Sequence, residues 1–248
     1  MSVEPKPVRH KPLGIKAYGS IPHLPNSRMG PADHHCHEGQ ARICTEQIKG
    51  RKDRIIVQEK LDGSCCSVAL INGEILALGR AGYLASTSPF VQHHMFAEWV
   101  AANEGRFRKV LNEGERLVGE WLAQAHGTRY DLTGREPFVA FDLMIGSERL
   151  VVQTVTDRVG KEFQLPPVLA YGPTPVEKAL ELLGQYGQYN ALDSVEGCVW
   201  RVEDGEEVNF LAKFVRPDKI DGVYLPEVSG KPAIWNWLSE SNKVSIKE

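Results

Sequence analysis

The dipeptide Asn72-Gly73 is the sequence feature that most constrains the fold of this chain. It separates two short apolar stretches, Cys65–Ile71 and Glu74–Gly79. Asn-Gly favours a two-residue type I′ turn, because both central positions of that turn need a positive φ. The sequence therefore predicts a β-hairpin from Cys65 to Gly79.

Further segments predict more antiparallel structure. Asp204-Gly205 predicts a second hairpin between Gly197–Val202 and Glu207–Phe214. Additional strands are predicted at Ile55–Glu59, Leu117–Leu122 and Pro137–Met144, and a short strand is possible within Ile15–Pro25. This succession of antiparallel pairs with interspersed helices indicates an α+β fold rather than a βαβ repeat.

Two helices are predicted between these strands. Phe90–Asn103 carries apolar residues on one face, and Gly105 stands where a C-terminal cap is expected. Thr174-Pro175-Val176-Glu177 has the order of a capping box with proline at the first helical position, which predicts a helix reaching about Tyr186.

Composition excludes several classes of protein. The net charge of −3 and pI near 6.3 argue against a generally basic nucleic-acid coat, although a local basic groove remains open. Five cysteines without a Cys-x-x-Cys spacing imply no disulfide framework and no zinc ribbon. Residues 1–11 are polar and do not form a secretory signal, and no apolar run approaches membrane-spanning length. We therefore expect a cytoplasmic protein that does not associate with membranes.

A set of short motifs carries the functional signal. Lys60-Leu61-Asp62-Gly63 follows a predicted strand, and alone it would also suit an exposed turn. Downstream come, in order, Arg80, Gly119-Glu120-Trp121, Phe141-Asp142, Val195-Glu196-Gly197 and Leu211-Ala212-Lys213-Phe214.

In this order the motifs resemble those of the covalent nucleotidyltransferases, and especially the ATP-dependent RNA ligases of the phage and bacterial type. The resemblance covers about residues 55 to 216. It implies a nucleotidyltransferase domain of antiparallel sheets flanked by helices at 54–220. An irregular arm at 1–53 would pack on this domain, and a short C-terminal extension would occupy 221–248.

The resemblance also implies roles for the motif residues. Lys60 would attack the α-phosphorus of ATP and hold AMP, for which its pKa should be depressed by burial or by neighbouring cations, including the metal and Lys213. Glu120 and Glu196 would hold Mg²⁺ or Mn²⁺ or the ribose, and Lys213 would contact the α-phosphate. Phe141 would stack on adenine, and Arg80 would bind AMP phosphate or the nucleic-acid end. The remaining cofactor-binding residues would be Glu59, Asp62, Gly63 and Arg216.

Each of these residues also has an ordinary structural interpretation. Phe141 on a strand suits a hydrophobic core, whereas Glu120 and Glu196 suit exposed strand ends and Arg80 a solvated turn. The pattern also departs from the family at Val215, where a second lysine is common, so Arg216 or Lys219 could substitute.

The short tail after Lys213 predicts a minimal RNA ligase without the OB-fold of DNA ligases and capping enzymes. Its expected substrate is RNA with 5′-phosphate and 3′-hydroxyl ends, joined by a monomer, with a separate end-healing or RNA-binding protein as a potential partner. The alternatives are a DNA nick-joining or capping-type enzyme, or a catalytically decayed protein that binds nucleic-acid ends.

The run Asp33-His34-His35-Cys36-His37-Glu38 leaves three interpretations open. It could be a polar loop, it could bind zinc, or with His23 and Arg28 it could line a pocket for phosphate or an RNA end. Consecutive ligands cannot easily surround one ion, which disfavours zinc.

Overall fold

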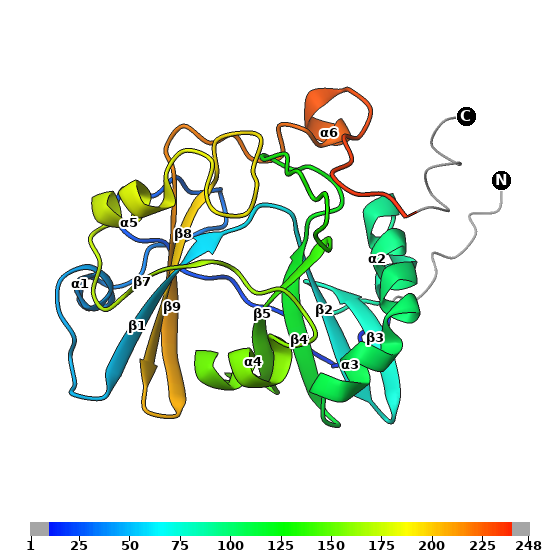
Figure 1. Cartoon of the computed structure of the whole chain (residues 1–248), viewed down its shortest axis with the longest axis horizontal. Helices are drawn as coiled ribbons and strands as arrows, with labels where there is room; N and C mark the ends of the chain where they lie inside the picture. The colour runs from blue at the N-terminus through cyan, green and yellow to red at the C-terminus, as the bar shows by residue number, and fades with distance from the viewer. Residues whose placement is uncertain (1–9, 240–248) are drawn as a thin grey trace.

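Two antiparallel sheets side by side form the framework of the computed structural model, which describes residues 10–239 (Figure 1). The start of the predicted arm and the end of the predicted C-terminal extension lie outside the described residues. The first sheet has the order β7 (Val168–Tyr171), β1 (Asp53–Lys60), β8 (Gly197–Asp204), β9 (Glu207–Val215). The second sheet has the order β3 (Glu74–Gly79), β2 (Ser64–Ile71), β4 (Glu115–Trp121), β5 (Phe138–Ile145), β6 (Glu148–Arg149). This arrangement confirms the predicted α+β class.

Helices flank both sheets (Figure 1). Beside the first sheet lie α1 (Glu38–Thr45) and α5 (Val176–Leu183). Beside the second sheet lie the 3₁₀ turn η1 (Ala85–Thr87), α2 (Val91–Ala102), α3 (Glu104–Val110) and α4 (Val152–Val159). The short α6 (Pro226–Ser229) lies in the C-terminal segment. No helix within residues 10–239 has the length and apolar character needed to cross a membrane.

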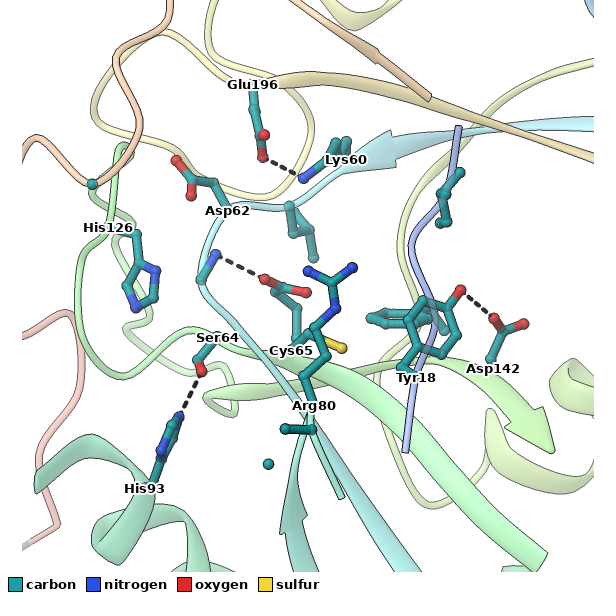
Figure 2. A pocket seen from close by; sticks show the side chains of 18 of the residues that line it. Tyr18, Lys60, Asp62, Ser64, Cys65, Arg80, His93, His126, Asp142 and Glu196 are labelled. Carbon is teal, nitrogen blue, oxygen red and sulfur yellow. Dashed lines mark hydrogen bonds and ion pairs between the residues drawn. The ribbon is translucent and has the colours of Figure 1, made fainter. Parts of the chain in front are cut away.

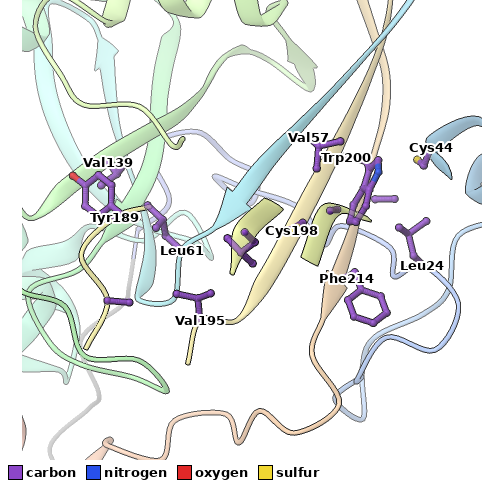
Figure 3. Close-up of a cluster of buried hydrophobic side chains, with 14 of the residues drawn as sticks. Leu24, Cys44, Val57, Leu61, Val139, Tyr189, Val195, Cys198, Trp200 and Phe214 are labelled. Atoms are coloured by element: carbon purple, nitrogen blue, oxygen red, sulfur yellow. The ribbon is translucent and has the colours of Figure 1, made fainter. Parts of the chain in front are cut away.

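Each sheet has its own hydrophobic core. Trp200, Phe214 and Val57 fill the first, together with Leu24 from the predicted arm (Figure 3). The second core is aromatic, and Phe96 packs on Trp121 with ring centroids 5.2 Å apart. Such aromatic pairs contribute about 0.5–1.5 kcal/mol beyond the burial of their area. The first core also includes Val139 of β5, so apolar contacts join the two sheets.

The structure confirms both predicted hairpins. Asn72 and Gly73 have φ values of 52° and 77°, and Ile71 pairs with Glu74 across the turn. The second hairpin joins β8 to β9, with Gly205 at φ 62° in its turn. The strands predicted at Ile55–Glu59, Leu117–Leu122 and Pro137–Met144 are also present, as β1, β4 and β5.

The predicted helix ends were wrong in two places. Asn103, not Gly105, separates α2 from α3, and its amide Nδ2 donates to the Trp99 carbonyl oxygen at 2.8 Å. The capping box at Thr174 does not form, because its hydroxyl donates instead to the Gly172 carbonyl oxygen at 2.9 Å.

The predicted ends of α5 and of the arm also need correction. Pro175 precedes α5 as its cap residue, and the helix ends at Leu183 rather than near Tyr186. The arm is irregular except for α1, and Ile15–Pro25 contributes only isolated bridges at His23 rather than a strand.

Candidate active site

A cavity of about 750 Å³ lies between the two sheets and receives residues from both (Figure 2). Lys60 ends β1 in the first sheet, and Glu120 lies on β4 in the second. The sequence-predicted residues that line this cavity are Glu59, Lys60, Asp62, Gly63, Arg80, Glu120, Phe141, Glu196 and Lys213. Residues spread over more than 150 positions of the sequence therefore meet at one place.

Asp62 fixes the crossing of the chain from one sheet to the other. Its backbone N–H donates to the Tyr130 hydroxyl at 3.0 Å. Its carboxylate accepts the Gly127 N–H at 3.0 Å and the Thr128 hydroxyl at 3.1 Å. The Asp side chain therefore orients the loop that follows Lys60, one of the roles that the motif resemblance implies.

Gly63 is required by close packing in the same loop. A Cβ at this position would lie 2.5 Å from the carbonyl oxygen of Trp121, well inside van der Waals contact. The Gly63 N–H donates to Glu120 Oε1 at 3.0 Å. Glu120 is therefore tied to the lysine loop and does not lie at an exposed strand end.

Lys60 contacts Glu196 directly, with Nζ 2.5 Å from Oε2. Burial by itself would lower the pKa of Lys60, but the negative charges of Glu196, Glu120 and Asp62 raise it above its usual range. Burial and the neighbouring lysine therefore do not depress the pKa of Lys60 by themselves, and of the cations named above the metal is the one that remains. The neighbouring carboxylates hold the amine in its protonated form.

Three carboxylates, those of Asp62, Glu120 and Glu196, surround Lys60, while Lys219 and Lys213 also act on Asp62 and Glu196, respectively. Burial raises the pKa of Glu120 to about 7, although the charge of Lys60 opposes this. Burial likewise raises the pKa values of Glu196 and Asp62. Such a group of hard oxygen donors fits a divalent cation.

The carboxylates of Glu120 and Glu196 both lie near Lys60. Within residues 10–239, no group of three His, Cys, Asp or Glu side chains is arranged to hold a metal ion by itself. Mg²⁺ is commonly held by one or two carboxylates together with phosphate oxygens and water. Glu120 and Glu196 fit that pattern, with a nucleotide supplying further oxygens.

Lys213 on β9 faces the same cavity. Burial and the charge of Lys60 lower its pKa. Its Nζ lies 3.6 Å from Oδ1 of Asp33, a residue of the arm. A cation in this place is suited to bind an anionic phosphate.

Arg80 and Phe141 form another part of the cavity wall. The Arg80 guanidinium donates to the Gly19 carbonyl oxygen at 3.2 Å and to the Ser20 hydroxyl at 3.4 Å, so it is not simply a solvated charge. Phe141 is half-buried and meets Tyr18 edge-on, with ring centroids 5.3 Å apart. Phe141 packs against a buried hydrophobic cluster and also lines the cavity.

Glu59 borders the cavity with its carboxylate committed elsewhere. Consecutive strand residues point to opposite faces, and Glu59 Oε2 accepts the Gln188 N–H at 2.7 Å. Burial raises the pKa of this carboxyl to about 7. Any contact with a nucleotide would therefore come from the Glu59 backbone.

Neither substitute for the missing second lysine reaches the cavity. The Arg216 guanidinium donates to the Gly184 carbonyl oxygen at 2.5 Å, and Arg216 does not line the cavity. Lys219 is buried, and its Nζ donates to three oxygens of neighbouring loops. Val215 itself is buried.

The histidines of the run Asp33–Glu38 do not line the cavity. His34, His35 and His37 are exposed, and Arg28 pairs with Asp221 at 2.7 Å. His23 by contrast lies 3.1 Å from Asp33 of the same run, so a pocket for phosphate or an RNA end at this place stays a prediction.

Sequence reasoning missed two histidines on the cavity wall. His93 Nε2 lies 2.9 Å from the Ser64 hydroxyl, and burial lowers the pKa of His93 to about 4. Burial also lowers the pKa of His126 to about 4. Neither belongs to a recognised motif, so only their polar character in apolar surroundings could have drawn attention to them.

Comparisons with known proteins identify a family and structures of similar fold. The family model described as RNA ligase matches residues 53–215. An apo variant of the Naegleria gruberi RNA ligase is 16% identical, covers 84% of this chain and 60% of its own, and has a TM-score of 0.50. Another variant of that ligase, with AMP and Mn, is 17% identical, covers 81% and 60%, and also has a TM-score of 0.50.

The match to these structures is partial in length. An archaeal ATP-dependent RNA ligase is 19% identical, with coverage of 66% of this chain and 42% of its own and a TM-score of 0.47. The chain spans about half the length of the solved structures it matches. A comparison with curated proteins gave no match. At these identities the structural likeness concerns the fold alone.

Proposed function

The chain belongs to the RNA ligase family, and from this premise we propose that it is an ATP-dependent RNA ligase that works through lysyl-AMP at Lys60. The observation that carries the proposal is the position of Lys60. Lys60 is the last residue of β1, and it lines a cavity large enough for a nucleotide. Glu120, Glu196 and Lys213 line the same cavity. A lysine amine attacks phosphorus only in its neutral form, so Lys60 must first lose the proton that the carboxylates favour.

In the first step, Nζ of Lys60 would attack the α-phosphorus of ATP. The N–P bond forms, the bond to pyrophosphate breaks, and the amine loses a proton to solvent or a neighbouring carboxylate. Because the neighbouring carboxylates favour protonated Lys60, its amine must lose a proton before it can attack. A divalent cation bound at Glu120 and Glu196 would neutralise their charge and lower the pKa of Lys60.

Other cavity residues would bind the nucleotide. Lys213 would stabilise charge on the α-phosphate as pyrophosphate leaves. Phe141 would stack on adenine, and Arg80 would bind AMP phosphate or the RNA end. The related structures with ATP or AMP and Mn support ATP with Mn²⁺ or Mg²⁺ as the ligands here.

AMP would then pass to the 5′-phosphate of RNA, and a 3′-hydroxyl would displace it to form the phosphodiester. The division into an arm at 1–53, a nucleotidyltransferase domain at 54–220 and an extension at 221–248 belongs to this proposal. A monomeric, cytoplasmic enzyme, alone or with a separate end-healing protein, remains our prediction.

Labelled ATP with Mg²⁺ or Mn²⁺ tests the proposal. The protein should become labelled, and Lys60→Ala should lose the label. Labelled GTP is the matched control, since labelling by GTP instead would indicate a capping-type enzyme. No label from either nucleotide would favour a decayed end-binding protein. A panel of 5′-phosphorylated RNA and DNA strands, nicked and single-stranded, would then define the substrate.

A further inference from the structure

The N-terminal arm joins the first sheet at Lys213. β9 is an edge strand of that sheet, and the arm covers it there. The Leu24 N–H donates to the Lys213 carbonyl oxygen at 2.8 Å, and the Lys213 N–H donates to the Pro22 carbonyl oxygen at 2.9 Å. Because Leu24 is fully buried in the core, this attachment is firm.

The arm then turns back and brings a carboxylate to the cavity. The His23 N–H donates to the His34 carbonyl oxygen at 2.8 Å, and the Cys36 N–H donates to the His23 carbonyl oxygen at 2.8 Å. Asp33 directly precedes His34, and its Oδ1 lies 3.6 Å from Nζ of Lys213. A segment far from Lys213 in sequence thus provides its ionic partner.

The second carboxylate oxygen of Asp33 is held in place by other residues of the arm. Its Oδ2 accepts the Gly30 N–H at 2.9 Å and lies 3.1 Å from His23 Nε2. The other ring nitrogen of His23 is 2.6 Å from the Ser27 hydroxyl, which in turn accepts the Val215 N–H at 2.9 Å. The chain of contacts therefore starts and ends on β9, at Lys213 and Val215.

Lys213 needs such a partner because of its other neighbours. The charges of Lys60 and Arg80 both disfavour its protonated form, whereas Asp33 and Glu196 favour it. A lysine side chain is a flexible stem with a point charge, so its head is positioned only by what it contacts.

We propose that Asp33 is a positioning residue that holds the Lys213 amine at the phosphate end of the cavity. This inference rests on the proposed function. It gives the arm a part in the first chemical step, because a misplaced Lys213 would stabilise the pentacoordinate phosphorus less well. Small misplacements of a catalytic group can cost up to about 100-fold in rate.

The test is single-turnover formation of lysyl-AMP in the full chain. Asp33→Asn should slow this step by about 10- to 100-fold. Asp33→Glu should retain much of the rate, because it keeps the charge. Glu38→Gln, an exposed change in the same arm, is the control and should leave the rate unchanged.

A double variant separates positioning from general damage. If Asp33 acts through Lys213, Asp33→Asn should add no further loss in a Lys213→Ala background. Full multiplication of the two losses would overturn the inference, as would a wild-type rate for Asp33→Asn. Failure of the wild-type protein to form lysyl-AMP would overturn the proposed function itself.

Discussion

Two groups of buried charges lie between the sheets, and they differ in balance. In the first, Asp142 accepts hydrogen bonds from the Tyr18 hydroxyl at 2.6 Å, from Arg149 at 3.1 Å and from Arg201. Arg201 also pairs with Glu203 at 2.7 Å. We call this group the paired cluster: Tyr18, Asp142, Arg149, Arg201 and Glu203.

The second group contains one amine and three carboxylates. We call it the lysine cluster: Lys60, Asp62, Glu120 and Glu196. Burial raises the pKa values of these three carboxyl groups. In the paired cluster, by contrast, two arginines form ion pairs with two acids. The paired cluster joins the two sheets, and in our proposal the lysine cluster provides negative charge for a divalent cation.

The largest effect on stability is expected in the paired cluster. Asp142→Ala would leave Arg149 and Arg201 without their shared carboxylate, and breaking a buried ion pair costs about 3–5 kcal/mol. Urea unfolding measures this cost directly. A loss below about 1 kcal/mol would show that the cluster does not join the sheets.

The next effect concerns the loop of the lysine cluster. Gly63→Ala would push a Cβ against the Trp121 carbonyl oxygen and shift the loop, so lysyl-AMP formation should fall by about 100-fold. Gly105→Ala is the matched control, because an added Cβ there meets nothing within 4 Å. Equal rates for the two variants would disprove the packing argument.

Glu120→Gln should separate stability from activity. With a folded-state pKa near 7 against an ordinary value of 4.5, the ionised Glu120 costs the protein stability as pH rises between these values. The Gln variant avoids that cost, so it should be more stable than wild type by about 1 kcal/mol at pH 8. The difference should vanish near pH 4.

The same variant should lose lysyl-AMP formation, because an amide binds a divalent cation poorly. Unfolding curves at the two pH values and the labelling assay together provide the measurement. A loss of stability at pH 8 would place Glu120 with the paired cluster instead.

The smallest effect is expected outside both clusters. Glu181→Gln removes an exposed pair with Lys178 at 2.9 Å, and such pairs contribute less than about 1 kcal/mol. Neither the unfolding midpoint nor lysyl-AMP formation should change appreciably. A larger change would mean that ion pairs contribute regardless of burial, which would remove the basis of the comparison.

Local signals made much of the fold predictable from sequence. The turn at Asn72-Gly73 follows the backbone preferences of its own residues, so it was predicted correctly, and the Glu113 carboxylate also accepts the Gly73 N–H at 3.0 Å. Thr174 was misjudged because its hydroxyl can accept a bond from a helix N–H or donate one to a nearby carbonyl, and the sequence does not say which bond forms.

Long-range electrostatics limited what could be predicted of the site. The residues around Lys60 were identified by their order in the chain, but the pKa of Lys60 depends on how closely three carboxylates approach. The partner of Lys213 was also missed, because Asp33 belongs to a distant segment without a motif. Both depend on distances in space that spacing in the sequence does not reveal.

The most direct test of the central claim is to locate the nucleotide on the protein. After incubation with ATP and Mn²⁺, proteolysis and tandem mass spectrometry should find AMP on the peptide that contains Lys60, attached to that lysine. An adduct on Lys213 or on any other residue, with Lys60 unmodified, would contradict the account.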